Sequence, residues 1–140
     1  MVIITHSEAE TETAGCQLAD KLKSGDCVAL YGSLGSGKTA FTRGVCQGFQ
    51  CTVDAHSPTY NIVNIYPGNI EIVHIDLYRV DGSLEEIGWD EFFDQERIAI
   101  IEWAEKAKND LPPKRLDVFF KIIDFEMREI RIVRKNGAGN

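Results

Sequence analysis

Residues 32–39 read Gly32-Ser33-Leu34-Gly35-Ser36-Gly37-Lys38-Thr39 and fit the pattern G-x-x-x-x-G-K-[ST] at every constrained position. At ordinary residue usage, this pattern arises by chance in roughly half a percent of chains of this length. The flanking sequence agrees with it. Residues 27–31 form a short apolar run typical of a buried strand, and residues 38–47 read as a helix with Gly48 as its C-terminal stop. The sequence predicts a strand, a glycine-rich loop and a helix in succession.

A loop of this composition suits phosphate chemistry. Glycines let the backbone turn its N–H groups inward, and the start of the following helix adds partial positive charge. Lys38 can reach the β- and γ-phosphates, and the Thr39 hydroxyl can ligate Mg²⁺. The sequence therefore predicts a nucleoside triphosphate site. The residues expected around the nucleotide phosphates are Ser33, Leu34, Gly35, Ser36, Gly37, Lys38, Thr39 and Ala40.

Length and composition indicate one ordinary globular domain over residues 1–140. The chain has 44% apolar and 26% charged residues, which is the usual range for a folded soluble protein. No apolar run approaches the ~18 residues of a membrane span, and residues 1–8 lack the features of a signal peptide. We expect a cytoplasmic protein that does not enter a membrane.

Charge and cysteine usage argue against a protein that clamps nucleic acid by itself and against a zinc-binding protein. The net charge of −7 makes the chain a poor clamp for nucleic acid by itself, because neutralising phosphates supplies most non-specific affinity. The four cysteines, at positions 16, 27, 46 and 51, form no C-x-x-C pair, and the three histidines are scattered. Buried free thiols are therefore a better interpretation than a structural zinc site.

The rest of the chain predicts a mixed sheet. Ser7-Glu8-Ala9-Glu10 has the form of a capping box and predicts a helix that runs to about residue 23. A short helix is expected at residues 103–110, in the second half of the chain. Further strands are expected at residues 2–4, 60–66, 70–76, 97–102, 116–125 and 130–133, and a frayed tail at 135–140. Strands alternating with helices, plus two hairpins, predict an α/β fold: a three-layer P-loop NTPase-like domain with a mixed sheet and hairpin additions.

Two acids stand where a phosphate-binding loop needs a carboxylate for its metal ion. Asp76 ends the apolar run 72–76, and Glu102 ends the run 98–102. Open α/β sheets bind ligands at the carboxyl ends of their strands, so both acids are expected at the phosphates. The pattern does not decide which of them dominates Mg²⁺ binding.

Three other residues each allow two interpretations. Thr59 could approach the γ-phosphate as a switch loop does, or it could open a strand after a proline turn. Trp103, judged from its surroundings in the sequence, is better explained as part of the core than as a nucleotide contact. His74 alternates with apolar neighbours, which favours a hydrogen-bonded structural residue over a metal ligand.

Missing motifs narrow the function. The chain has no N-K-x-D run for reading guanine, which favours adenine, and no arginine-rich lid of the kind that small-molecule kinases use. Arg43 and Arg79 are the only arginines near the motifs, and an arginine finger is worth ~10³–10⁵ in rate, so slow intrinsic hydrolysis is expected. These features predict an auxiliary ATPase or switch. A small-molecule kinase, and a nucleotide-dependent binding module without obligatory turnover, remain as alternatives.

Several motifs together resemble one family. In order they are residues 32–39 with Phe41-Thr42-Arg43-Gly44, Ser57-Pro58-Thr59-Tyr60, His74-Ile75-Asp76-Leu77-Tyr78-Arg79 and Ile101-Glu102-Trp103. Residues 85–88 and 111–112 also fall where that family has similar residues. From about residue 27 to residue 112, the chain resembles the TsaE family, the bacterial ATPases of tRNA threonylcarbamoyladenosine biosynthesis.

The resemblance implies that the protein binds and hydrolyses ATP with Mg²⁺ beside TsaB- and TsaD-like partners, which modify the adenosine next to the tRNA anticodon. It implies contact with tRNA only through that complex. The resemblance further implies that Thr39 and Glu102 ligate Mg²⁺, that Trp103 lies near the nucleotide, and that Thr11 lies near the base or ribose. The residues that it assigns to ATP hydrolysis are Lys38, Thr59, Asp76 and Glu102.

The chain departs from the family pattern at two positions. Ser33 stands where the family commonly has Asp inside the phosphate loop, so hydrolysis or partner contact is expected to differ if that carboxylate takes part. Ala104 stands where the family usually has Pro after the Trp, and we expect this change to affect only the local backbone.

Overall fold

The computed structural model describes residues 1–52, 62–79, 94–107 and 110–137. Within these residues, a mixed sheet has the strand order β1-β7-β6-β2-β5-β4-β3. The strands are β1 (Val2–Thr5), β2 (Cys27–Tyr31), β3 (Val63–Tyr66), β4 (Ile72–Asp76), β5 (Ile98–Glu102), β6 (Lys114–Ile122) and β7 (Arg128–Asn136). The helices are α1 (Glu8–Ala19), α2 (Lys38–Gly48) and the 3₁₀-helix η3 (Ala104–Lys106).

The middle of the sheet is parallel, and its two margins are antiparallel. β2 lies between β5 and β6 and pairs in parallel with both, and β4 continues the parallel part beside β5. The β3–β4 and β6–β7 hairpins and the β1–β7 pair add the antiparallel strands. The predicted mixed sheet with hairpin additions is confirmed, and it sets the carboxyl ends of β2, β4 and β5 along one edge.

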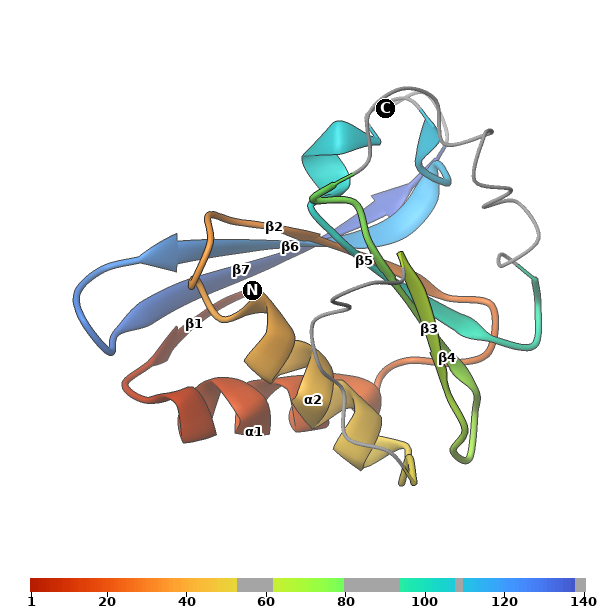
Figure 1. The fold of residues 1–140 in the computed structure, drawn as a ribbon, viewed down its shortest axis with the longest axis horizontal. Coiled ribbons are helices and arrows are strands. Elements are labelled where there is room, and N and C mark those ends of the chain that lie inside the picture. Colours follow the sequence, from red (N-terminus) through yellow and green to blue (C-terminus); the bar gives the residue numbers. More distant parts are fainter. Residues whose placement is uncertain (53–61, 80–93, 108–109, 138–140) are drawn as a thin grey trace.

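Helices α1 and α2 lie side by side across one face of the sheet (Figure 1). The core on that face is built from apolar side chains such as Leu18, Leu30, Phe41 and Ile100. On the other face, the segment of η3 packs Ala104 and neighbouring residues against the outward side chains of β2, β4 and β5. The described chain thus has a helical layer, a sheet and a thinner third layer, as the sequence predicts.

Helix α1 begins as predicted but ends earlier. Ser7 is its N-cap, and the Ser7 hydroxyl accepts a hydrogen bond from the Glu10 backbone N–H at 3.1 Å. The expected helix to residue 23 is wrong, because the chain tightens after Ala19. The N–H of Lys21 bonds to Leu18 O and that of Leu22 to Ala19 O, which are i→i−3 bonds of a 3₁₀-type turn.

Gly48 is not the stop of α2, which is a second correction. The helix includes Gly48, and Gln50 takes the left-handed conformation (φ 56°) that ends it. The N–H groups of Cys51 and Gln50 bond to the carbonyls of Cys46 and Gln47, both at 3.0 Å, which is a Schellman motif. Gly48 serves packing instead, because a Cβ there would lie 2.3 Å from the Cβ of Ala19 in α1.

The C-terminal hairpin also differs from the prediction. Asp124 Oδ1 accepts the backbone N–H groups of Glu126 and Met127 at 3.2 and 3.0 Å, so β6 gives way to a turn before Phe125. The predicted tail at 135–140 begins too early, since Lys135 and Asn136 belong to β7 and pair with Arg115 and Lys114. Residues 138–140 lie outside the described chain.

The structure bears on the predicted thiols and on the question of a membrane span. All four cysteines are free thiols; Cys27 and Cys46 are buried as predicted, whereas Cys16 and Cys51 are only partly buried. In the four described segments, no helix has the length and apolar character needed to cross a bilayer.

Candidate nucleotide-binding site

A pocket of about 440 Å³ opens at the carboxyl edge of the parallel strands, beside the glycine-rich loop. The predicted site residues that line it are Thr11, Leu34, Gly35, Ser36, Gly37, Lys38, Thr39, Ala40, Asp76, Glu102 and Trp103. Ser33 is exposed on the loop and does not line the pocket. Thr59 and the motif residues 85–88 lie outside the described residues. The structure therefore brings most of the predicted set into one cavity.

The loop has the backbone geometry that an anion requires. Gly35 (φ 77°) and Gly37 (φ 107°) are left-handed, a conformation that side chains disfavour. Gly37 is the N-cap of α2 and offers no side-chain cap, so the first N–H groups of that helix are left for another acceptor. The Ser36 hydroxyl is buried and finds no hydrogen-bond partner in the described chain. These unsatisfied donors suit a ligand rich in acceptor oxygens.

Lys38 is held at the wall of the pocket. Its Nζ donates to Gly32 O at 2.6 Å and lies 3.5 Å from the centre of the Trp103 ring. Burial lowers the pKa of Lys38, while the carboxylates of Glu102, Glu105 and Asp76 act in the opposite direction. Lys38 is thus the one cation among the predicted site residues, and its ammonium lies between an indole face and nearby carboxylates.

Trp103 is only partly buried and lines the pocket, so the interpretation as plain core filler is incomplete. Its ring contacts the Lys38 ammonium on the pocket side and packs at a tilt on the Tyr78 ring, with centroids 4.9 Å apart. Ala104, the second departure from the family pattern, is fully buried at the start of η3.

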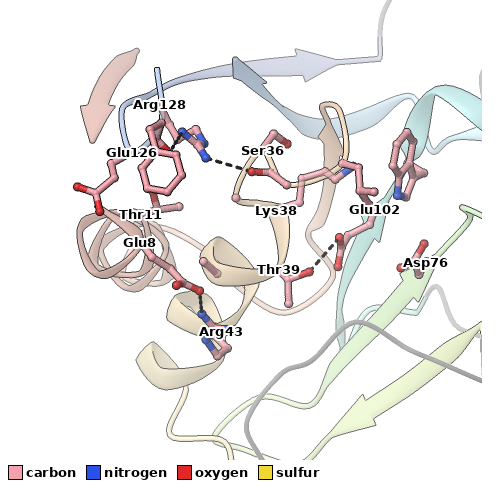
Figure 2. A pocket seen from close by; sticks show the side chains of 16 residues that line it. Glu8, Thr11, Ser36, Lys38, Thr39, Arg43, Asp76, Glu102, Glu126 and Arg128 are labelled. Carbon is pink, nitrogen blue, oxygen red and sulfur yellow. Dashed lines mark hydrogen bonds and ion pairs between the residues drawn. The ribbon is translucent and has the colours of Figure 1, made fainter. Parts of the chain in front are cut away.

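Glu102 and Asp76 lie side by side at the ends of β5 and β4, as Figure 2 shows, and their Cα atoms are paired in the sheet. The Thr39 hydroxyl donates to Glu102 Oε1 at 3.4 Å, whereas Asp76 Oδ1 accepts the backbone N–H of Tyr78 at 2.9 Å. Glu102 is almost fully buried. Because Glu102 bonds to Thr39, it faces the loop directly, whereas Asp76 lies on the next strand, β4.

His74 is a buried, hydrogen-bonded residue, as its sequence position predicts. Its Nε2 contacts Glu102 Oε2, and its Nδ1 lies 2.9 Å from the Tyr66 hydroxyl. The described residues contain no cluster of three or more His, Cys, Asp or Glu side chains able to hold a metal on their own. Any cation at Glu102 must therefore share other ligands, such as a hydroxyl and phosphate oxygens.

The structure adds pocket residues that sequence reasoning missed. Arg128 reaches from β7 to Gly35 O at 3.2 Å, and Glu126 of the same hairpin lies beside it (Figure 2). Phe125 also lines the pocket. Glu8 of α1 and Arg43 of α2 also line the pocket and form an ion pair at 2.7 Å. From the sequence, Arg43 is identifiable only as an arginine near the loop. The hairpin residues carry no local motif, so only the tertiary fold reveals them.

The α/β sheet with its glycine-rich loop between β2 and α2 defines a protein of the P-loop class. Within that class, the family described as "Threonylcarbamoyl adenosine biosynthesis protein TsaE" matches residues 5–130. The chain belongs to the TsaE family, which confirms the resemblance seen in the motifs and places the chain in a family of tRNA threonylcarbamoyladenosine biosynthesis.

Individual relatives agree with this assignment. The chain is similar to the tRNA threonylcarbamoyladenosine biosynthesis protein TsaE of Bacillus subtilis, with 35% identity over 127 residues, covering 90% of this chain and 80% of the relative. It is 38% identical over 136 residues to TsaE of Rickettsia typhi, covering 94% and 93%. The crystal structure of YdiB from B. subtilis superposes with a TM-score of 0.79 at 30% identity, covering 98% of this chain and 86% of YdiB.

Proposed function

We propose that the protein binds ATP with Mg²⁺ in this pocket and hydrolyses it slowly, as an auxiliary ATPase for threonylcarbamoyl modification of tRNA. The observation that carries the proposal is the convergence of Lys38, Thr39 and Glu102 on one glycine-rich loop. The two oxygens of Thr39 and Glu102 lie 3.4 Å apart. Oxygens in adjacent positions around Mg²⁺, each at about 2.1 Å, lie about 3 Å apart, so this pair needs little movement to share the ion.

Different residues of the pocket are proposed to bind the phosphates and the metal ion. Lys38 and the N–H groups at the start of α2 bind the phosphates, and the unpartnered Ser36 hydroxyl can donate to the same oxygens. Thr39 and Glu102 would hold Mg²⁺, which neutralises charge on the phosphates when bound. Asp76, beside Glu102 but turned to the Tyr78 backbone, is suited to orient water at the edge of the site. We therefore rank Glu102 ahead of Asp76 for the metal.

We expect slow ATP turnover by the isolated chain because the arginines at the pocket already bind other groups of the protein. The arginines that line the pocket are Arg43 and Arg128. Arg43 is paired with Glu8 and Glu12, and Arg128 donates to Gly35 O and to carbonyls of its own hairpin. Both guanidinium groups are therefore engaged within the chain, and neither is free to act as an arginine finger, the group worth ~10³–10⁵ in rate. A partner protein is expected to supply the missing element or to order it.

The partners that we propose are TsaB- and TsaD-like proteins, with tRNA reached only through their complex. The net charge of −7 disfavours strong binding of tRNA by the isolated chain. The experiment is to measure Mg²⁺-dependent ATP hydrolysis with and without these partners, together with partner affinity in the ATP-analogue, ADP and nucleotide-free states. We expect faster hydrolysis with partners and unequal affinities. Equal affinity in all three states would contradict the switch, and a phosphorylated acceptor would indicate a kinase instead.

A further inference from the structure

A line of buried hydrogen bonds runs behind the pocket, from the β3–β4 hairpin to the glycine-rich loop. The Tyr66 hydroxyl lies 2.9 Å from His74 Nδ1, and His74 Nε2 contacts Glu102 Oε2. The other carboxylate oxygen, Oε1, accepts from Thr39 at 3.4 Å. Tyr66 and Glu102 are each 2% exposed and His74 is 0% exposed, so water does not compete for these bonds.

The donors and acceptors along this line follow if Glu102 is ionised, which is the form of a carboxylate that ligates a divalent cation, and if His74 is neutral. An ionised carboxylate only accepts hydrogen bonds, so His74 Nε2 must carry the proton that lies between it and Glu102. In the neutral imidazole, Nδ1 is then the acceptor, and the Tyr66 hydroxyl donates to it. Tyr66 thereby selects the tautomer that presents an N–H to Glu102. One carboxylate oxygen is fully committed to His74, and the second is left for Thr39 and the pocket.

Packing alone does not explain a histidine at position 74. The residue stands on the face of β4 that packs against the helices, next to Ile72 and beside Ile100 of β5, which are both buried. An apolar side chain would fill this place without the cost of burying polar groups. The imidazole supplies what an apolar residue could not, which is a directional bond to the acid at the site.

We propose that His74, held by Tyr66, is a positioning residue that fixes Glu102 with one oxygen turned toward Thr39 and so sets the affinity of the nucleotide site for a divalent cation. This inference rests on the proposed function, because it concerns the metal side of the same site. His74 acts through Glu102 and does not itself line the pocket.

The test compares two amide substitutions that replace different ring nitrogens. His74→Gln places its amide nitrogen near the position of Nε2 and keeps a donor for Glu102, whereas His74→Asn reaches only the position of Nδ1 and loses it. The readout is the dissociation constant of Mn²⁺ from the ADP complex, followed by electron paramagnetic resonance. Loss of a partner behind a metal ligand typically costs 10–100-fold in metal affinity, so we expect at least a tenfold weaker Mn²⁺ complex for His74→Asn. We expect His74→Gln to restore most of the affinity.

ADP affinity in the presence of EDTA is the internal control, and it should be the same in wild type and both variants. Tyr66→Phe, which keeps the ring and removes only the hydroxyl, is the second variant if His74→Asn does not fold, and it should weaken Mn²⁺ binding severalfold. A purely structural role would lower the melting temperature of these variants while leaving the Mn²⁺ constant unchanged, and that result would overturn the inference. If wild type itself held no Mn²⁺ with ADP, the proposed function would fail, and the inference with it.

Discussion

Replacing Gly44 by Ala should destabilise the protein, although alanine favours a helix over glycine. Gly44 lies in α2 where its backbone meets that of α1. A Cβ at this position would stand 1.8 Å from Glu12 O and 2.7 Å from Glu12 C, and a Cβ on Gly15 opposite would stand 2.1 Å from Phe41 O. These neighbours are backbone atoms of a helix, which cannot rotate away as a side chain can. The two helices must therefore move apart.

The size of the effect follows from two opposing terms. Alanine gains about 1 kcal/mol over glycine in a helix interior. Overpacking typically costs about 1–3 kcal/mol and occasionally more, and a separation of over 1 Å along the α1–α2 contact belongs at the upper end. We expect a net loss of about 2 kcal/mol, or a fall in melting temperature of roughly 6 °C for a domain of this size.

Nucleotide affinity at the proposed site should fall when the α1–α2 contact is disturbed. Thr11 of α1 is almost fully buried, and its Cγ2 would lie 3.3 Å from a Cβ placed on Gly37, so α1 supports the glycine loop directly. Urea unfolding and ADP calorimetry measure the two effects. Thr13→Ala, on the exposed side of α1, is the matched control and should stay within about 0.5 kcal/mol of wild type. A Gly44→Ala protein as stable as wild type would refute the close-packing argument.

Three further predictions concern charges. Lys38→Ala removes charge-assisted contacts worth ~1.5–3 kcal/mol, so ATP affinity measured by calorimetry should fall at least tenfold; unchanged affinity would contradict the phosphate-loop assignment. Glu102→Gln should abolish most ATP hydrolysis while part of nucleotide binding survives, and Asp76→Asn should slow turnover. If Glu102→Gln stayed fully active and Asp76→Asn lost its Mg²⁺ dependence, our ranking of the two acids would be reversed. Burial raises the pKa of the Cys27 thiol from 9.0 to about 12, so above pH 9 the unfolded chain loses this proton while the folded chain keeps it. The free energy of unfolding should then fall by about 1.4 kcal/mol per pH unit between these values, and the same pH dependence in urea titrations of Cys27→Ala would show that another group is responsible.

The parts of the site that the sequence predicts are those that follow from local rules. The glycine loop, the strand before it and the helix after it have a strict spacing, and each takes its expected place. Asp76 and Glu102 were expected together only because both end apolar runs. The parallel pairing of β4 with β5 confirms this by setting the two residues opposite each other. Their roles toward Mg²⁺ stay predictions.

Other features could not be predicted, because the role of a glycine or an arginine depends on tertiary contacts that the local sequence does not specify. Gly48 has the position of a helix stop, but the approach of Ala19 gives it a packing role that only the tertiary fold reveals. Arg128 enters the pocket because β7 folds back over a loop that is distant in sequence. Whether Thr59 approaches the phosphates also stays a prediction, since it lies outside the described residues.

The position of β2 in the sheet has a consequence for biosynthesis. Both of its neighbours are made long after it, since Val28 pairs with Ile100 on one side and with Leu116 on the other. At ~5–20 residues per second, a ribosome needs several seconds to add those segments, and non-local strand pairing is slow in any case. During that time, the glycine loop follows an apolar strand without neighbours. We therefore expect the proposed nucleotide ligand to stabilise the completed fold and not the newly made strand and loop.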